Sequence, residues 1–239
     1  MISYRTMDAT CLLTTCLHKG PIPLAQCQAP ASVPAYVETI ADIPQGSVAR
    51  VLRSLSERYG ACGVVAVQEQ MVVGKIRCYP QVVCDRLPGA CVQQEGPFRA
   101  LLALDIESLP ARDQAPTLRI DCFQVAEEHR GQGIAGGMLD TLIEWAKAAG
   151  WKTLTANAIR QIPPLLNWCG QAGCESLRRR GFVVVSEQMN PELREGVVSQ
   201  RGGFHGPQVQ HEWNAFTEVS DDEAATLFEM MLVFRENDS

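Results

Sequence analysis

The chain has 239 residues, of which 46% are hydrophobic and 20% are charged, and this ordinary globular composition excludes a disordered or fibrous protein. A formal net charge of -6 and a pI of about 5.3 argue against a general nucleic-acid-binding protein, because such proteins usually carry a surplus of basic residues. No apolar run approaches the roughly 20 residues that cross a bilayer, and the first residues lack a signal-peptide pattern, so we expect a cytoplasmic protein without a membrane partner.

The first regular element is predicted at Ser47, because five prolines interrupt the chain before it. Ser47 can cap a helix that runs to about Tyr59, and Gly60 is a typical helix end. Two β-branched runs follow at residues 63–67 and 71–76. The polar link between them predicts a hairpin of two antiparallel strands.

Residues 80–118 contain five prolines around an apolar run from Phe98 to Ile106, and we interpret this stretch as an insertion with one strand of its own. The next strand is predicted at Leu118–Val125. After a glycine-rich turn, apolar residues recur at helical spacing up to about Ala149, which predicts an amphipathic helix. The remaining predicted elements are strands at 153–156, 182–186 and 230–234, a short helix at 174–180, and a last helix that begins near Ser220 after a polar stretch.

The ten cysteines do not indicate a metal site, because no two of them are spaced as Cys-x-x-Cys. Zinc ligands in proteins usually occur as closely spaced pairs. We therefore expect no metal, and we interpret the cysteines as reduced thiols, several of which serve as small core residues.

The glycine-rich turn carries the strongest functional signal. A helix N-terminus presents unpaired backbone N–H groups and partial positive charge. Glycines remove side chains there, so a phosphate can approach those N–H groups closely, and an arginine can add a charge-assisted hydrogen bond. We therefore predict a pyrophosphate site made by Arg130, Gly131, Gln132, Gly133, Ile134 and Ala135.

Three interpretations of this turn are open. Acyl-CoA binding is the one that we favour. Dinucleotide binding is suggested by the pattern Gly131-x-Gly133-x-x-Gly136, but that fold needs an acidic residue about 20 positions later, and the corresponding region reads Ala156-Asn157-Ala158. The third interpretation is structural, a turn that only lets the helix pack closely.

These residues resemble the GNAT acyltransferase superfamily. The resemblance rests on Val125, the spaced glycines of 130–135, the hairpin ending in Val72-Val73-Gly74, and the Leu-Arg-Arg-Arg-Gly-Phe segment at 177–182. It implies a mixed α/β, mostly antiparallel twisted sheet that is flanked by helices and has a V-shaped splay between its central strands. We expect a single domain over 1–239 with its core at 47–186, an N-terminal arm at 1–46, an insertion at 80–118 and a C-terminal extension at 190–239.

The resemblance also implies a reaction. Acetyl-CoA or another acyl-CoA is the expected co-substrate, with its pyrophosphate on the N–H groups from Gln132 to Ala135. Its pantetheine arm is expected along the strand at Phe123, Gln124 and Val125. A small-molecule or peptide amine is the expected acceptor, and it attacks the thioester directly in a ternary complex. No nucleic acid is expected, and a homodimer is left open.

The best candidate for a general base is Asp121, on the strand that leads to the site. Residues two apart in a strand share a face, so Asp121, Phe123 and Val125 are expected to point the same way. An edge carboxylate that is solvated or paired with Arg119 is the alternative. Glu69 and Glu127 are weaker candidates, because both lie in predicted turns.

The sequence departs from the family at the general acid. Many members place a tyrosine four residues before the Gly-Phe pair, where this chain has Leu177. A thiol with a pKa of about 8.5 can leave as a thiolate without an acid, so the substitution does not forbid catalysis. It nevertheless leaves a second interpretation open, an acyl-CoA-binding sensor or interaction module without turnover.

Overall fold

The computed structural model describes residues 1–235 except 14–16, 18–19, 29–46 and 88–100. Two parts of the chain each form a compact unit of their own, Met1–Leu154 with Phe234–Ser239, and Thr155–Val233. Within the described residues, no helix combines the length and the apolar character that crossing a membrane requires.

The first unit is built on an antiparallel sheet. Its strands β1 (Ile2–Thr6), β3 (Gly63–Gln68), β4 (Met71–Pro80) and β5 (Thr117–Val125) are neighbours in that order. The short strand β2 (Ile22–Pro23) pairs with the start of β4. The β3–β4 hairpin turns through Glu69 and Gln70, whose positive φ values of 50° and 66° suit the right-handed twist of a two-residue hairpin.

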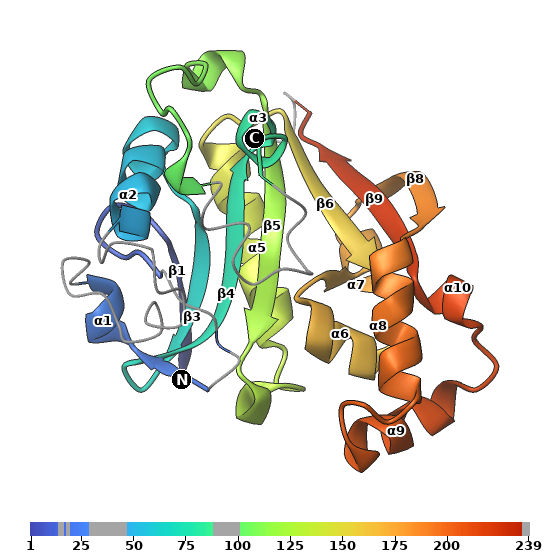
Figure 1. The fold of residues 1–239 in the computed structure, drawn as a ribbon. Coiled ribbons are helices and arrows are strands. Elements are labelled where there is room, and N and C mark those ends of the chain that lie inside the picture. The colour runs from blue at the N-terminus through green and yellow to red at the C-terminus, as the bar shows by residue number, and fades with distance from the viewer. Residues whose placement is uncertain (14–16, 18–19, 29–46, 88–100, 236–239) are drawn as a thin grey trace. The chain divides into compact units, whose positions relative to one another are not determined.

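Two long helices, α2 (Ser47–Tyr59) and α5 (Ile134–Ala148), and several short helical segments accompany this sheet. Helix α5 lies behind β4 and β5 in Figure 1 and packs on the sheet through buried apolar residues that include Met138 and Leu142. The other helical segments are α1 (Leu24–Gln28), α3 (Gln81–Cys84), η2 (Arg112–Gln114) and η3 (Glu127–His129).

Glycines allow α5 to approach the sheet closely. A Cβ atom at Gly74 of β4 would lie 2.9 Å from Cε of Met138, and one at Gly137 of α5 would lie 2.2 Å from Cζ of Tyr4 on β1. A side chain at either position would push the helix outward, so these two residues set the spacing between α5 and the strands.

The second unit contains strands β8 (Val183–Met189) and β9 (Thr226–Val233), which pair antiparallel, and β7 (Ala172–Gly173), which pairs parallel with the end of β6 (Thr153–Ile159). Helices α6 (Pro163–Cys169) and α7 (Cys174–Arg178) precede β8. Four helical segments connect β8 to β9, namely α8 (Pro191–Arg201), α9 (Pro207–Trp213), η4 (Asn214–Phe216) and α10 (Asp221–Ala224).

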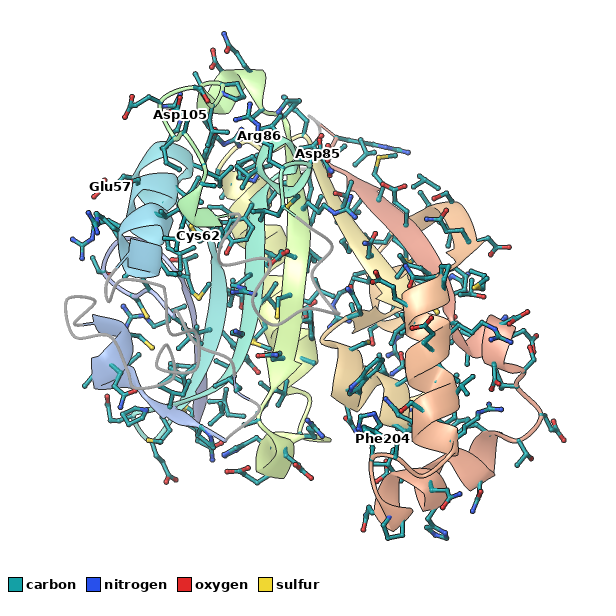
Figure 2. The ribbon with its side chains drawn as sticks, in the orientation of Figure 1. Glu57, Cys62, Asp85, Arg86, Asp105 and Phe204 are labelled. Carbon is teal, nitrogen blue, oxygen red and sulfur yellow. The ribbon has the colours of Figure 1, made fainter. Side chains whose placement is uncertain are left out.

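The helices between β8 and β9 are held together by Trp213, which is 2% exposed. Its indole Nε1 donates to Oε1 of Gln200 at 2.9 Å, and the guanidinium of Arg201 lies 4.8 Å from its ring centroid. Phe204, in the turn between α8 and α9, is 84% exposed and points outward (Figure 2). This segment joins the paired strands β8 and β9. The C-terminal extension expected at 190–239 stays a prediction.

The predicted fold class is confirmed, since the chain is a mixed α/β protein whose strand pairs are mostly antiparallel. One strand was expected within 80–118, around the apolar run at 98–106. In the described part of that run Leu101 and Leu102 are helical, and residues 98–100 lie outside the described part of the chain. The single domain and the V-shaped splay between the central strands stay predictions.

Candidate active site

Strand β5 contains a β-bulge at Asp121. The register with β4 pairs Arg77 with Cys122 and Cys78 with Ile120, so Asp121 has no residue directly opposite it in β4. A bulge inserts one extra residue and interrupts the alternation of side chains between the two faces of a strand.

Phe123 and Val125 face helix α5. Directly opposed residues of an antiparallel pair share a face, and Val125 opposes Gly74 while Phe123 opposes Ile76. Gly74 touches α5 at Met138, which identifies this face of the sheet as the one that α5 covers.

Asp121 lies on the other face of the sheet. Gln124 opposes Lys75 there, and its Oε1 atom accepts a hydrogen bond of 3.1 Å from the backbone N–H of Leu17. Arg77 follows Lys75 by two residues and therefore shares its face. Nη2 of Arg77 lies 3.5 Å from Oδ2 of Asp121, which places the carboxylate on this face, away from α5.

One sequence-based expectation about Asp121 does not hold. Asp121 does not share a face with Phe123 and Val125, because the bulge reverses the alternation between them. Among the described residues its ion-pair partner is Arg77, whereas the alternative interpretation had paired it with Arg119. Both members of the pair are nearly buried, with side-chain exposures of 6% for Arg77 and 9% for Asp121.

The start of α5 has two left-handed glycines before it and no side-chain cap. Gly131 and Gly133 have φ values of 74° and 77°, in the left-handed region that favours glycine, and a Cβ atom at either position would have no neighbour within 4 Å. Gly133 is the N-cap, and no side chain caps the helix. The first N–H groups of this 15-residue helix therefore have no side-chain acceptor among the described residues.

Two side chains brace the turn before α5. Nε of Arg130 lies 3.4 Å from the carbonyl oxygen of Val125, and Nε2 of Gln132 lies 3.4 Å from that of Glu128, in geometry that allows each to donate a hydrogen bond. Arg130 thus ties the turn to the end of β5. Ile134 is buried, so only its backbone can contribute to a ligand site, and Ala135 is half-buried.

The sequence analysis did not identify the buried titratable side chains that lie near Arg77 or Asp121. Burial raises the pKa of the Cys62 thiol to about 12 and the pKa values of the Cys84 thiol and the Tyr79 phenol well above their ordinary ranges. Cys62 lies between α2 and the sheet (Figure 2), where its thiol donates to the carbonyl of Leu52. One feature of the sequence could have indicated these residues. Two charged residues, Lys75 and Arg77, lie within an otherwise apolar strand.

The other candidates of the sequence analysis lie elsewhere. Glu69 is exposed in the β3–β4 turn, and Glu127 is exposed at the start of η3. Leu177 is fully buried in α7 of the second unit. Among the described residues, no group of three or more histidine, cysteine or acidic side chains could hold a metal ion.

Comparison with known proteins agrees with this arrangement of strand, turn and helix. Residues 38–161, which make up more than half of the chain, match the acetyltransferase (GNAT) family. No curated protein matches the sequence.

The chain is also similar to solved structures. One is a GNAT family acetyltransferase from Elizabethkingia anophelis with acetyl-CoA bound, at 14% identity over 98% of both chains and a TM-score of 0.41. Ard1 from Thermoplasma volcanium matches at 10% identity over 98% of this chain and 99% of that chain, with a TM-score of 0.44. Ribosomal-protein-alanine N-acetyltransferase from Brucella melitensis matches at 16% identity over 86% and 88%, with a TM-score of 0.43.

Proposed function

Because the chain belongs to the acetyltransferase (GNAT) family, we propose that it transfers an acetyl or another short acyl group from acyl-CoA to a primary amine. The acceptor is a small molecule or a peptide that attacks the thioester directly in a ternary complex. The observation that carries this proposal is the uncapped N-terminus of α5, which follows two left-handed glycines with free space at their Cβ positions.

The residues at this helix start fit a pyrophosphate. The backbone N–H groups from Gln132 to Ala135 supply donors together with the positive end of the α5 dipole. Gly131 and Gly133 leave space for the phosphate oxygens. The pantetheine arm then follows β5 from Val125 towards Phe123, where backbone groups hydrogen-bond to its amides. When bound, acyl-CoA supplies the activated thioester.

Asp121 is the proposed general base. An alkylamine has a pKa of about 10.4, so reaching its neutral form at pH 7 costs about 4.6 kcal/mol. Asp121 lies four residues before Val125 on the same strand, and the bulge turns it to the face opposite α5. In this proposal the amine approaches from that face and passes its proton to Asp121, while a backbone N–H of β5 stabilises the oxyanion.

A second candidate function is an acyl-CoA sensor without turnover. It is favoured by Leu177, a fully buried aliphatic residue at the position where many family members have a tyrosine that acts as the general acid. A thiolate can leave without that acid, so the enzyme remains the first proposal.

The experiment is a titration of the purified protein with acetyl-CoA by calorimetry, followed by measurement of free thiol in the presence of amines. The panel comprises spermidine, lysine, ethanolamine and a peptide with a free N-terminus. Saturable thiol release supports the enzyme. Tight binding without thiol release from any amine supports the sensor, and absence of binding at millimolar acetyl-CoA refutes both.

A further inference from the structure

Tyr79 lies on the same face of the sheet as the proposed base. It follows Arg77 by two residues on β4, and the register opposes it to Arg119 of β5. It is fully buried, with a relative exposure of 0%. The charged groups Arg77 and Asp121 both act on its phenol electrostatically.

The hydroxyl of Tyr79 has no hydrogen-bond partner among the described residues. Burial raises the pKa of this phenol well above its ordinary value, so it stays protonated and can donate. A buried hydroxyl without a partner destabilises the folded state, and a phenylalanine would fill nearly the same volume without that cost. The hydroxyl therefore needs an explanation other than packing.

The Arg77–Asp121 pair leaves the carboxylate room to accept another donor. A charge-assisted hydrogen bond usually joins its two heavy atoms at about 2.7–2.9 Å, whereas Nη2 of Arg77 and Oδ2 of Asp121 are 3.5 Å apart. A carboxylate has about four acceptor positions, and the one ion pair that Asp121 makes among the described residues does not fill them. The titratable and charged groups around Asp121 in the described part are Arg77, Cys78 and Tyr79 on β4, Arg119 on β5 and Cys84 on α3.

We propose that Tyr79 is a positioning residue for Asp121, a role that rests on the proposed function. When the acceptor amine is bound, the Tyr79 hydroxyl donates to the carboxylate and fixes the oxygen that receives the amine proton. Tyr79 keeps its own proton throughout. Its donation stabilises the ionised carboxylate, which is the form that accepts the amine proton.

The test is Tyr79→Phe, with Tyr59→Phe as its matched control. The Tyr59 hydroxyl is also buried but donates to the carbonyl of Pro110 at 2.8 Å, so its loss lowers Tm and leaves the kinetics unchanged. Tyr79→Phe is expected to leave Tm unchanged or raise it by about 2–4 °C, because an unpaired buried hydroxyl is removed.

The kinetic probe is acetyl-CoA with the most active amine of the panel, and with water alone as acceptor. Tyr79→Phe is expected to lower kcat about tenfold, to leave the KM for acetyl-CoA unchanged and to move the acidic limb of the pH–rate profile to higher pH. In an Asp121→Asn background the same substitution should have no further effect on kcat.

Wild-type kcat and an unchanged pH–rate profile in Tyr79→Phe would overturn the proposal. So would a fall in kcat that accompanies a fall in Tm, because that pattern indicates a packing role. If the wild-type protein binds acetyl-CoA but turns over with neither the amines nor water, the proposed enzyme fails, and this inference fails with it. A Tyr79→Phe variant with normal turnover refutes only the inference.

Discussion

The guanidinium of Arg77 and the carboxylate of Asp121 form an ion pair across the β-bulge of β5, 3.5 Å apart and almost shielded from solvent. Removing one partner of a buried pair leaves the other charge without compensation, which typically costs about 3–5 kcal/mol. Arg77→Leu should therefore lower the free energy of unfolding by about 3 kcal/mol or more in a urea titration.

The double variant Arg77→Leu/Asp121→Leu is the control for this prediction. It removes both charges and should recover a substantial part of the stability lost in Arg77→Leu, because no buried charge is left unpaired. Asp121→Leu completes the set. If the double variant loses as much stability as Arg77→Leu and Asp121→Leu lose together, the ion pair does not contribute to stability.

The helix start at Gly133 gives a prediction about ligand affinity. Gly133→Glu places bulk and negative charge where the pyrophosphate is expected, so the affinity for CoA should fall by at least 100-fold, or about 2.7 kcal/mol. Its measurement is calorimetric titration with CoA.

Gly133→Ala is the matched variant. The φ of 77° at this position strains any side chain, by about 1–2 kcal/mol of stability, and the alanine tests that effect without charge. The alanine should keep most of the CoA affinity, since a Cβ atom there meets open space. Equal affinities for CoA in Gly133→Glu and the wild type would count against the phosphate site.

Those parts of the fold that depend on local patterns could be predicted from the sequence. The β3–β4 hairpin and α5 were predicted because alternation, helical periodicity and a glycine-rich turn act over a few residues. Helices α8 and α9 were missed, because contacts distant in sequence stabilise them, such as the hydrogen bond from Trp213 to Gln200. Intrinsic helix propensity is a local property of each residue, so it does not indicate a contact of this kind.

The candidate site shows the same division. The turn at 131–133 was found because only glycine suits its backbone, and both glycines do have positive φ values. The bulge was not predicted, because the burial of β5 alternates up to Cys122 as it would in a regular strand. The partners of Asp121 depend on that bulge and on the register with β4, neither of which the sequence encodes locally.

The buried thiols predict a loss of stability at alkaline pH. The pKa of Cys62 rises from 9.0 to about 12 on folding, because burial disfavours the thiolate. Below pH 9 the thiol is protonated in both states. Above that pH only the unfolded chain loses the proton, so the free energy of unfolding should fall as the pH rises from 9 towards 12.

Urea titrations across this range measure the effect, and Cys62→Ala should reduce the slope of the fall. Burial also raises the pKa values of the Cys78 and Cys84 thiols, so the fall in stability should persist with a smaller slope in the variant. A free energy of unfolding that stays constant from pH 9 to pH 11 would contradict the prediction. Reaction of Cys62 with iodoacetamide in the folded protein at pH 8 would also contradict it, since the thiolate fraction there is about 1 in 10⁴.

The contact between Tyr4 and Gly137 reverses the usual effect of a glycine-to-alanine change in a helix. Alanine is intrinsically more favourable than glycine inside a helix by about 1 kcal/mol. At Gly137, however, a Cβ atom would lie 2.2 Å from Cζ of Tyr4, so α5 or the tyrosine must move. Gly137→Ala should therefore lower the free energy of unfolding by about 1–3 kcal/mol.

The control is the same change in a Tyr4→Ala background, where the ring is absent and Gly137→Ala should become neutral or stabilising. Urea denaturation of the wild type, the two single variants and the double variant measures the difference. A stabilising Gly137→Ala in the wild-type background would show that α5 does not need glycine to pack against β1.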